Sequence, residues 1–251
     1  MISVRSRFTF FVRCLLLGVA FADTTACSAW AGSLSNGSFE SVPDSSTGQG
    51  LLPNNWLDAG NIEPGADTYS NDGSYGLAPS DFGQFTGVVA ADGIRWVAGA
   101  DFADGFHEAF SQLLGATLTP GASYIFSAAI HQSFGFDPGP GGYEVLLSPS
   151  AAFNDVGAVS LGTLAPTAGE DTWLSRSLTF TAPANASALP YFVLSPLAAT
   201  DVSAYIGIDN VSLDANPNAA VPEPGTFTIF AIASGLMAVI RFRRSKKVIR
   251  H

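Results

Sequence analysis

The stretch from Tyr205 to Leu213 reads Tyr-Ile-Gly-Ile-Asp-Asn-Val-Ser-Leu and predicts a β-strand with one irregularity. Ile206 and Ile208 are apolar at even positions, whereas Val211 and Leu213 are apolar at odd positions. Because side chains alternate between the two faces of a strand, the buried face changes between these pairs. A β-bulge at the two intervening residues explains the change, and so does a strand that is buried on both faces.

Short alternating runs elsewhere predict further strands. Tyr124, Phe126, Ala128 and Ile130 share one face of a strand, and residues 172–182 carry a second apolar face that includes one arginine. Further candidate strands are residues 86–97, 106–114, 142–148 and 187–194. Long segments with helical periodicity are absent before residue 225. Many short strands with glycine and proline between them predict an all-β fold, a β-sandwich whose length suits a jelly roll.

The C-terminal segment has the pattern of a membrane tail. An apolar run of sixteen residues, 225–240, follows a Pro-Glu-Pro triplet and precedes a basic cluster that includes Arg241, Arg243 and Arg244. As a helix the run would be about 24 Å long, which is short for a hydrocarbon core of roughly 30 Å. We expect a transmembrane helix over residues 225–241, with basic residues 242–251 in the cytoplasm.

The kind of membrane tail is indicated by the triplet Pro222, Glu223 and Pro224. The triplet, the apolar run and the basic end together resemble the PEP-CTERM sorting signal of bacterial surface proteins. The resemblance implies processing by an exosortase-type membrane transpeptidase, with the inner membrane as a temporary anchor. Residues 216–224 then form a linker that ends in the triplet.

The N-terminus predicts a signal peptide over residues 1–31. Basic residues precede an apolar stretch, and Ala29 and Ala31 form an A-x-A cleavage pattern; cleavage after Ala22 is the competing site. We therefore expect export through the Sec translocon, and then a cell-surface or extracellular-matrix location. Cys14 and Cys27, the only cysteines, both lie upstream of Ala31, so the mature protein would contain no thiol.

The region between the two signals, residues 32–215, is expected to form one strongly acidic domain. Residues 33–220 contain two basic residues, Arg95 and Arg176, and 19 of the 21 acidic residues, which gives a net charge of −17. This charge excludes nucleic acid as a partner and favours cations.

Several motifs of this domain resemble galactose-binding-like jelly rolls, which include carbohydrate-binding modules. The motifs are Leu34–Glu40 (LSNGSFE), Pro53–Trp56 (PNNW), Asn71–Ser74 (NDGS), Leu118–Ser127 (LTPGASYIFS), Thr172-Trp173 and the closing Tyr205–Leu213. The resemblance implies a structural calcium ion (Ca2+) between the first and last strands, with Glu40 and Asp209 as its side-chain ligands. A second possibility is that these carboxylates satisfy backbone groups or Arg176.

Glycan binding in such a fold requires aromatic faces and polar side chains in loops. The candidates are Trp96, Phe102, Phe106, His107, Phe134, Phe136 and Tyr143. Core packing is the competing interpretation for each of them, and it is the expected role of Trp56 and Trp173.

The sequence offers little for catalysis, since no nucleophile elbow, zinc-binding helix or phosphate-binding loop is present. We therefore expect a non-catalytic exported protein that binds exopolysaccharide. The alternatives are a self-associating structural protein of the matrix and a glycoside hydrolase that uses Glu108 with Asp101 or Asp104.

Overall fold

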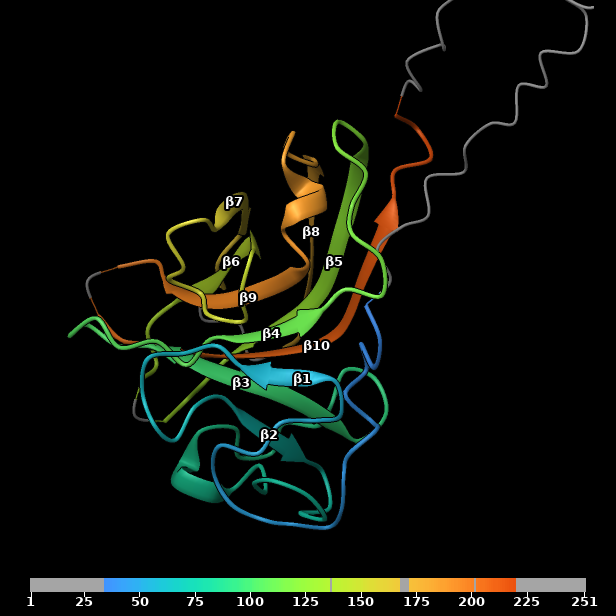
Figure 1. Cartoon of the computed structure of the whole chain (residues 1–251). Coiled ribbons are helices and arrows are strands. Elements are labelled where there is room, and N and C mark those ends of the chain that lie inside the picture. Colours follow the sequence, from blue (N-terminus) through green and yellow to red (C-terminus); the bar gives the residue numbers. More distant parts are fainter. Residues whose placement is uncertain (1–33, 136, 168–171, 201, 220–251) are drawn as a thin grey trace, which may run out of the picture.

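The computed structural model describes residues 34–135, 137–167, 172–200 and 202–219, which form two antiparallel sheets packed face to face (Figure 1). The predicted signal peptide, the Pro-Glu-Pro triplet, the apolar tail and the basic end lie outside these residues. Within the described ranges, no helix has the length and apolar character needed to cross a membrane.

Each sheet has five strands. The first sheet has the order β1-β4-β9-β6-β7 and comprises β1 (Trp56–Asp58), β4 (Phe110–Leu113), β9 (Tyr191–Ala198), β6 (Gly141–Ser148) and β7 (Val159–Leu164). The second has the order β2-β3-β10-β5-β8 and comprises β2 (Asp67–Ser70), β3 (Arg95–Asp101), β10 (Ala204–Ala215), β5 (Ser123–Gln132) and β8 (Leu174–Thr181). Two short 3-10 turns, η1 (Asp81–Gly83) and η2 (Ala186–Ala188), are the helical elements of the described chain. The predicted all-β sandwich is confirmed, and its strand order is consistent with a jelly roll.

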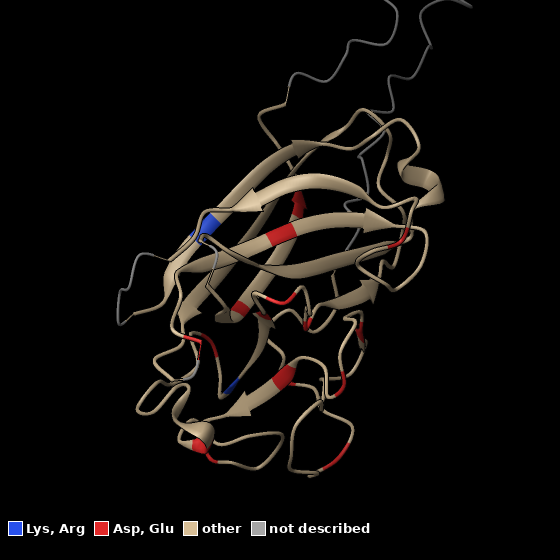
Figure 2. Ribbon diagram, turned by 90° about the vertical axis from the view of Figure 1, so that its left-hand side faces the viewer, with Lys and Arg blue, Asp and Glu red and all other residues tan. Residues whose placement is uncertain are grey.

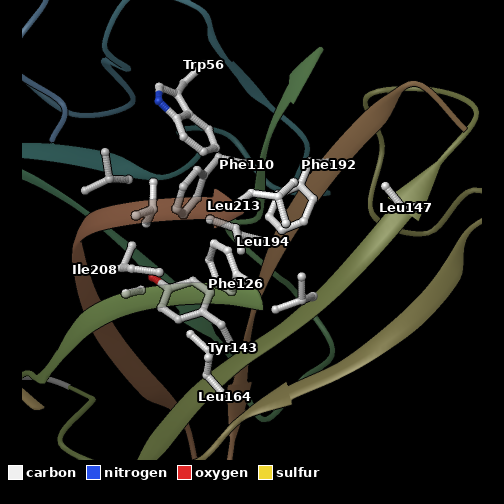
Figure 3. Packing of buried hydrophobic residues seen from close by; sticks show 14 of the residues in the cluster. Trp56, Phe110, Phe126, Tyr143, Leu147, Leu164, Phe192, Leu194, Ile208 and Leu213 are labelled. Carbon is white, nitrogen blue, oxygen red and sulfur yellow. The ribbon is translucent and has the colours of Figure 1, made fainter. Parts of the chain in front are cut away.

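The interior of the sandwich is built from the alternating residues that the sequence indicated. Tyr124, Phe126, Ala128 and Ile130 of β5 all lie in the core, as predicted. At one end of the core, Trp56 packs 5.3 Å from Phe39 and 5.4 Å from Phe110 between ring centroids. Figure 3 shows Trp56 and Phe110 beside the aliphatic side chains of the core. The packing role expected for Trp56 is confirmed, and such aromatic clusters contribute strongly to the buried apolar area.

The β-bulge predicted in β10 is present. Asp209 pairs with Ala129 and Ser212 with Ser127, so β10 contains one more residue than β5 between these two pairs. Asn210, inside the bulge, has a φ of 49°, in the left-handed region that asparagine tolerates better than most residues. Both halves of the strand therefore direct their apolar residues into the same core.

The strand expected at residues 86–97 starts much later, at Arg95. The preceding residues belong to a long loop, 71–94, which contains η1. In this loop Leu77 makes an isolated bridge to Tyr69 of β2, whereas Phe85 and Val88 pack against the outer face of the second sheet. The strands expected at 106–114 and 187–194 are also shorter or shifted, because their first residues form loops and η2.

Candidate functional site

A second aromatic cluster lies on the outer face of the second sheet. Tyr69 of β2 stacks on Trp96 of β3, with centroids 5.4 Å apart and planes 12° from parallel. Phe85, from the loop, packs edge-on against Tyr69 at 5.0 Å and lies 5.7 Å from Tyr205 of β10. Trp96 and Tyr205 directly precede Val97 and Ile206, which face the sandwich core, so their side chains point to the opposite face of the sheet. The 71–94 loop, seen below β2 and β3 in Figure 1, thus creates a small separate core.

At the edge of this cluster is a cleft of about 230 Å³, which we call the acidic cleft. Its walls come from β2, from η1 and the residue after it, from the residue after β3, from the start of β10, and from the segments before β1, β4 and β6. The lining residues are Gln49, Asp67, Tyr69, Phe82, Gln84, Phe102, Glu108, Asp137 and Tyr205. Three carboxyl groups and four aromatic rings therefore meet in one concave site, although they are widely separated along the chain.

Asp67 is held rigidly at the base of the cleft. Its Oδ1 accepts a 2.7 Å hydrogen bond from the backbone N–H of Gly50, and its Oδ2 accepts one of 2.7 Å from the Tyr205 hydroxyl. Burial raises the pKa of Asp67 above its ordinary value, and these two hydrogen bonds oppose the rise. The Tyr205 hydroxyl keeps its proton, because burial and the negative charge of Asp67 raise the pKa of Tyr205 well above its usual value.

Glu108 is the second buried acid of the cleft. Its backbone N–H donates to Ala100 O, and its Oε2 accepts a 3.0 Å hydrogen bond from Ala100 N–H, so the residue is fixed beside the end of β3. The side chain is nine-tenths buried, and within the described chain no donor is seen for Oε1. Burial raises the pKa of Glu108 to about 8, with a smaller contribution from the charge of Asp67. Glu108 is therefore protonated at neutral pH, when no ligand is bound.

The chemistry of the acidic cleft is that of a hydrogen-bonding site for neutral or cationic groups. The residues that line it include no lysine, arginine or histidine. Carboxyl and amide groups can accept or donate hydrogen bonds to hydroxyls, and exposed Phe82 and half-buried Phe102 add apolar ring surface. Phosphates and sulfates would meet acidic groups with no compensating positive charge.

A second cavity lies beyond the 84–89 segment of the loop. It measures about 510 Å³ and is lined by Thr86, Gly87, Val88, Val89, His131, Phe134, Thr172 and Trp173. Trp173 is fixed by a 2.7 Å hydrogen bond from its Nε1 to Val89 O. Phe134 is 43% exposed, and its backbone N–H donates to Gln84 O. The two cavities are therefore neighbours, joined through Gln84 and the segment that follows it.

The structure brings two of the predicted glycan-binding residues to these cavities. Phe102 lines the acidic cleft and Phe134 lines the second cavity. Trp96 lies in the aromatic cluster beneath them and is fully buried.

The other predicted glycan-binding residues lie elsewhere. Tyr143 is fully buried in the sandwich core, where its hydroxyl donates to Ile206 O. Phe106 is 42% exposed outside both cavities. His107 packs against Phe153 at 4.8 Å, and its Nδ1 is 3.3 Å from Asp101 Oδ1. Phe136 is not among the described residues.

Sequence reasoning missed most of the acidic cleft. Asp67 and Tyr69 share one face of β2, but a strand of four residues shows too little alternation to be recognised. The sequence places Tyr205 in a strand, but its contact with Asp67 spans 138 positions of sequence, which no local pattern reveals. The sequence offers one signal, the spacing of Asp67 two positions before Tyr69. This signal is weak, because acidic residues are frequent in the chain.

The two carboxylates expected to bind calcium, Glu40 and Asp209, are both satisfied by N–H groups. Glu40 Oε1 accepts hydrogen bonds from Ile94 N–H at 2.7 Å and Arg95 N–H at 2.9 Å, and its Oε2 is 3.2 Å from Arg95 Nη1. Arg95 Nη1 also donates to Glu40 O, so the guanidinium already supplies a positive charge beside this carboxylate.

Asp209 is engaged in a similar way, by backbone donors alone. Its Oδ2 accepts a 2.8 Å hydrogen bond from Asp92 N–H, and its Oδ1 accepts one of 2.6 Å from Asn210 N–H. Calcium needs several free oxygen ligands. In the described ranges, no group of three acidic, histidine or cysteine side chains is arranged to hold a metal ion. The N–H groups around Glu40 and Asp209 therefore fit carboxylates that accept hydrogen bonds better than carboxylates that bind calcium.

Comparison with known proteins shows a likeness of fold. No family model matches the chain, and no curated protein matches it. A cyclase from Fischerella sp. TAU is 17% identical, covering 77% of this chain and 100% of that chain, with a TM-score of 0.44. The CBM22-1–GH10 modules of Clostridium thermocellum xylanase 10B are 16% identical over 75% of this chain and 29% of that chain, with a TM-score of 0.42.

The carbohydrate-binding module TmCBM61, solved with β-1,4-galactotriose, is 14% identical over 73% of this chain and 97% of that chain, with a TM-score of 0.40. The structural neighbours thus include jelly rolls of the carbohydrate-binding-module type. At identities and TM-scores this low, the comparisons carry no functional inference. The function proposed below rests on the residues of this chain.

Proposed function

We propose that this protein is an exported, non-catalytic surface or matrix protein that binds a glycan in the acidic cleft. The observation that carries the proposal is the meeting of Asp67, Glu108 and Asp137 with aromatic rings in a concave site whose described lining contains no basic residue. Sugar recognition uses this combination, because ring faces stack on aromatic side chains and hydroxyls bond to carboxyl and amide groups.

The size of the cleft favours a small number of sugar units. About 230 Å³ is below the range of roughly 300–1,000 Å³ that is typical of pockets for drug-sized ligands. One sugar ring would fill the cleft, and a longer chain would continue over exposed Phe82 at its rim.

Export and sorting belong to the same proposal and rest on the two ends of the sequence. The protein would pass through the Sec translocon, remain anchored in the inner membrane, and be released to the surface by an exosortase-type enzyme. Replacing Pro222, Glu223 and Pro224 with alanine should retain the protein in the membrane fraction. Release of this variant at the wild-type level would contradict the sorting step but leave glycan binding untouched.

Binding can be tested with the full-length protein on a glycan array, followed by titration of any hit. Phe102→Ala should weaken binding by about tenfold, because it removes an aromatic wall of the cleft. Phe106→Ala is the matched control, since Phe106 is exposed and lies outside the cleft. Equal losses in both variants, or no retention on any glycan, would refute the proposed site.

Hydrolysis is the second candidate function, and one observation favours it. Two buried carboxyl groups, Asp67 and Glu108, line the same cleft, and a protonated acid is one requirement for cleaving a glycosidic bond. Neither partner suggested by the sequence lines the cleft: Asp101 accepts a hydrogen bond from Ala198 N–H, and Asp104 is exposed. Release of reducing ends from a bound glycan, abolished by Glu108→Gln, would identify a hydrolase.

A further inference from the structure

We infer that the acidic cleft binds an amino sugar whose amine is not acetylated, and that it holds this amine as an ammonium group. This inference rests on the proposed glycan binding and specifies its ligand class.

The three carboxyl groups of the cleft come from separate elements and influence one another. Asp67 is on β2, Glu108 is in the loop before β4, and Asp137 is in the loop before β6. The charges of Asp67 and Asp137 both act on Glu108 and disfavour its ionised form. Asp67 is buried with no counter-charge in the described lining, so a cation that enters the cleft would stabilise its ionised form and that of Glu108.

The described residues supply no cation to this cleft. In the described part of the chain the basic residues with permanent charge are Arg95 and Arg176. The Arg95 guanidinium binds Glu40 and the Ser74 hydroxyl, and Arg176 donates to Ala165 O and Pro166 O. Figure 2 shows acidic residues spread through the loops at the lower end of the sandwich. A cationic ligand can therefore supply a positive charge that the described lining of the cleft lacks.

A bare metal ion is a poor fit for this role. Among the described residues, no three acidic, histidine or cysteine side chains come close enough to coordinate one ion. An ammonium group attached to a sugar ring is larger and reaches its acceptors through N–H bonds. It can donate to Glu108 Oε1, for which no donor is seen in the described chain, while its ring contacts Phe82 or Phe102.

Protonated Glu108 is compatible with this pairing. Because burial raises the pKa of Glu108 to about 8, the free protein carries a proton on this carboxyl at neutral pH. An unprotonated amine that enters the cleft can take that proton, which moves from the Glu108 oxygen to the amine nitrogen. The result is an ammonium–carboxylate pair with no change in the total number of protons. Aromatic walls also favour a cation over a neutral group.

The test is calorimetric titration of the full-length protein with three short β-linked oligomers of equal length, made of glucosamine, N-acetylglucosamine and glucose. We expect the glucosamine oligomer to bind tighter than the other two by about tenfold or more, as for one charge-assisted hydrogen bond. Glu108→Gln should remove this preference. Glu144→Gln, on β6 and outside the cleft, should leave it intact.

The outcomes separate this inference from the function on which it rests. Equal affinity for all three oligomers would overturn the amino-sugar assignment and leave glycan binding standing. An aliphatic diamine that binds as tightly as the glucosamine oligomer would overturn the sugar part of the assignment. Failure of every glycan to bind, here and on the array, would refute the proposed function itself and this inference with it.

Discussion

Tyr205 and Asp67 are joined by a 2.7 Å hydrogen bond from the tyrosine hydroxyl to Asp67 Oδ2. The bond connects β10 to β2 across β3, which lies between them in the sheet. It fixes the buried carboxyl at the base of the acidic cleft and ties the edge strand β2 to the centre of the sheet. The cleft and the stability of this edge are therefore coupled.

Tyr205→Phe should lower the free energy of unfolding by about 1–3 kcal/mol, because it leaves Asp67 Oδ2 buried without its donor. Chemical denaturation followed by tryptophan fluorescence measures this loss. Tyr191→Phe is the matched control, since Tyr191 is half-buried on β9 and its hydroxyl has no partner seen among the described residues. Equal stability of the two variants would show that the hydrogen bond contributes nothing.

The raised pKa of Glu108 predicts that stability falls as the pH rises. The folded protein keeps a proton on Glu108 up to about pH 8, whereas the unfolded chain loses it near pH 4.5. The folded state therefore binds more protons between these values, and the free energy of unfolding decreases across this window. The groups whose charge acts on Glu108 are Asp67, Asp137 and Asp58, and its own charge acts on Tyr69, Tyr143 and Tyr205.

Denaturation at several pH values tests this linkage. We expect a higher free energy of unfolding at pH 5 than at pH 8, and a flatter profile in Glu108→Gln. A residual slope should remain in that variant, because burial also raises the pKa of Asp209 to about 7. Glu144→Gln should reproduce the wild-type profile. A wild-type profile that rises with pH would contradict the buried, protonated state of Glu108.

Calcium binding between Glu40 and Asp209 stays a prediction of the sequence resemblance, and the contacts of these residues favour the opposite result. An ion that binds only the folded protein must raise its melting temperature. Because N–H groups already satisfy all four carboxylate oxygens, we expect no shift on adding calcium or chelator. An upward shift with calcium that Asp209→Asn abolishes would establish the metal site.

The bulge in β10 makes a separate prediction about stability. Asn210 has a φ of 49°, so Asn210→Ala should destabilise the protein by about 1 kcal/mol, and Asn210→Gly should not. Asp214→Ala is the control, at an exposed position after the bulge in the same strand. Thermal melting compares the three variants. If Asn210→Ala melts like the wild type, the left-handed conformation carries no cost.

The sequence predicted the parts of the fold that depend on local alternation. β5, β8 and the bulge in β10 follow from the two-residue period of their own side chains. The same reasoning was wrong for residues 86–94. Val88 and Ala90 pack on the outer face of the second sheet, and Val89 is exposed, so the apolar run is not a strand of the core. The acidic cleft was the least predictable feature, since it joins Asp67, Glu108 and Tyr205 from distant segments.

The most direct measurement of the central claim is titration of the best-bound glycan against the full-length protein and two cleft variants. We predict that Phe102→Ala and Asp67→Asn, in the acidic cleft, each weaken binding by about tenfold or more while the circular dichroism spectrum is unchanged. Phe134→Ala, in the second cavity, should bind almost as the wild type does. Loss of binding in Phe134→Ala alone, with both cleft variants unaffected, would contradict the account.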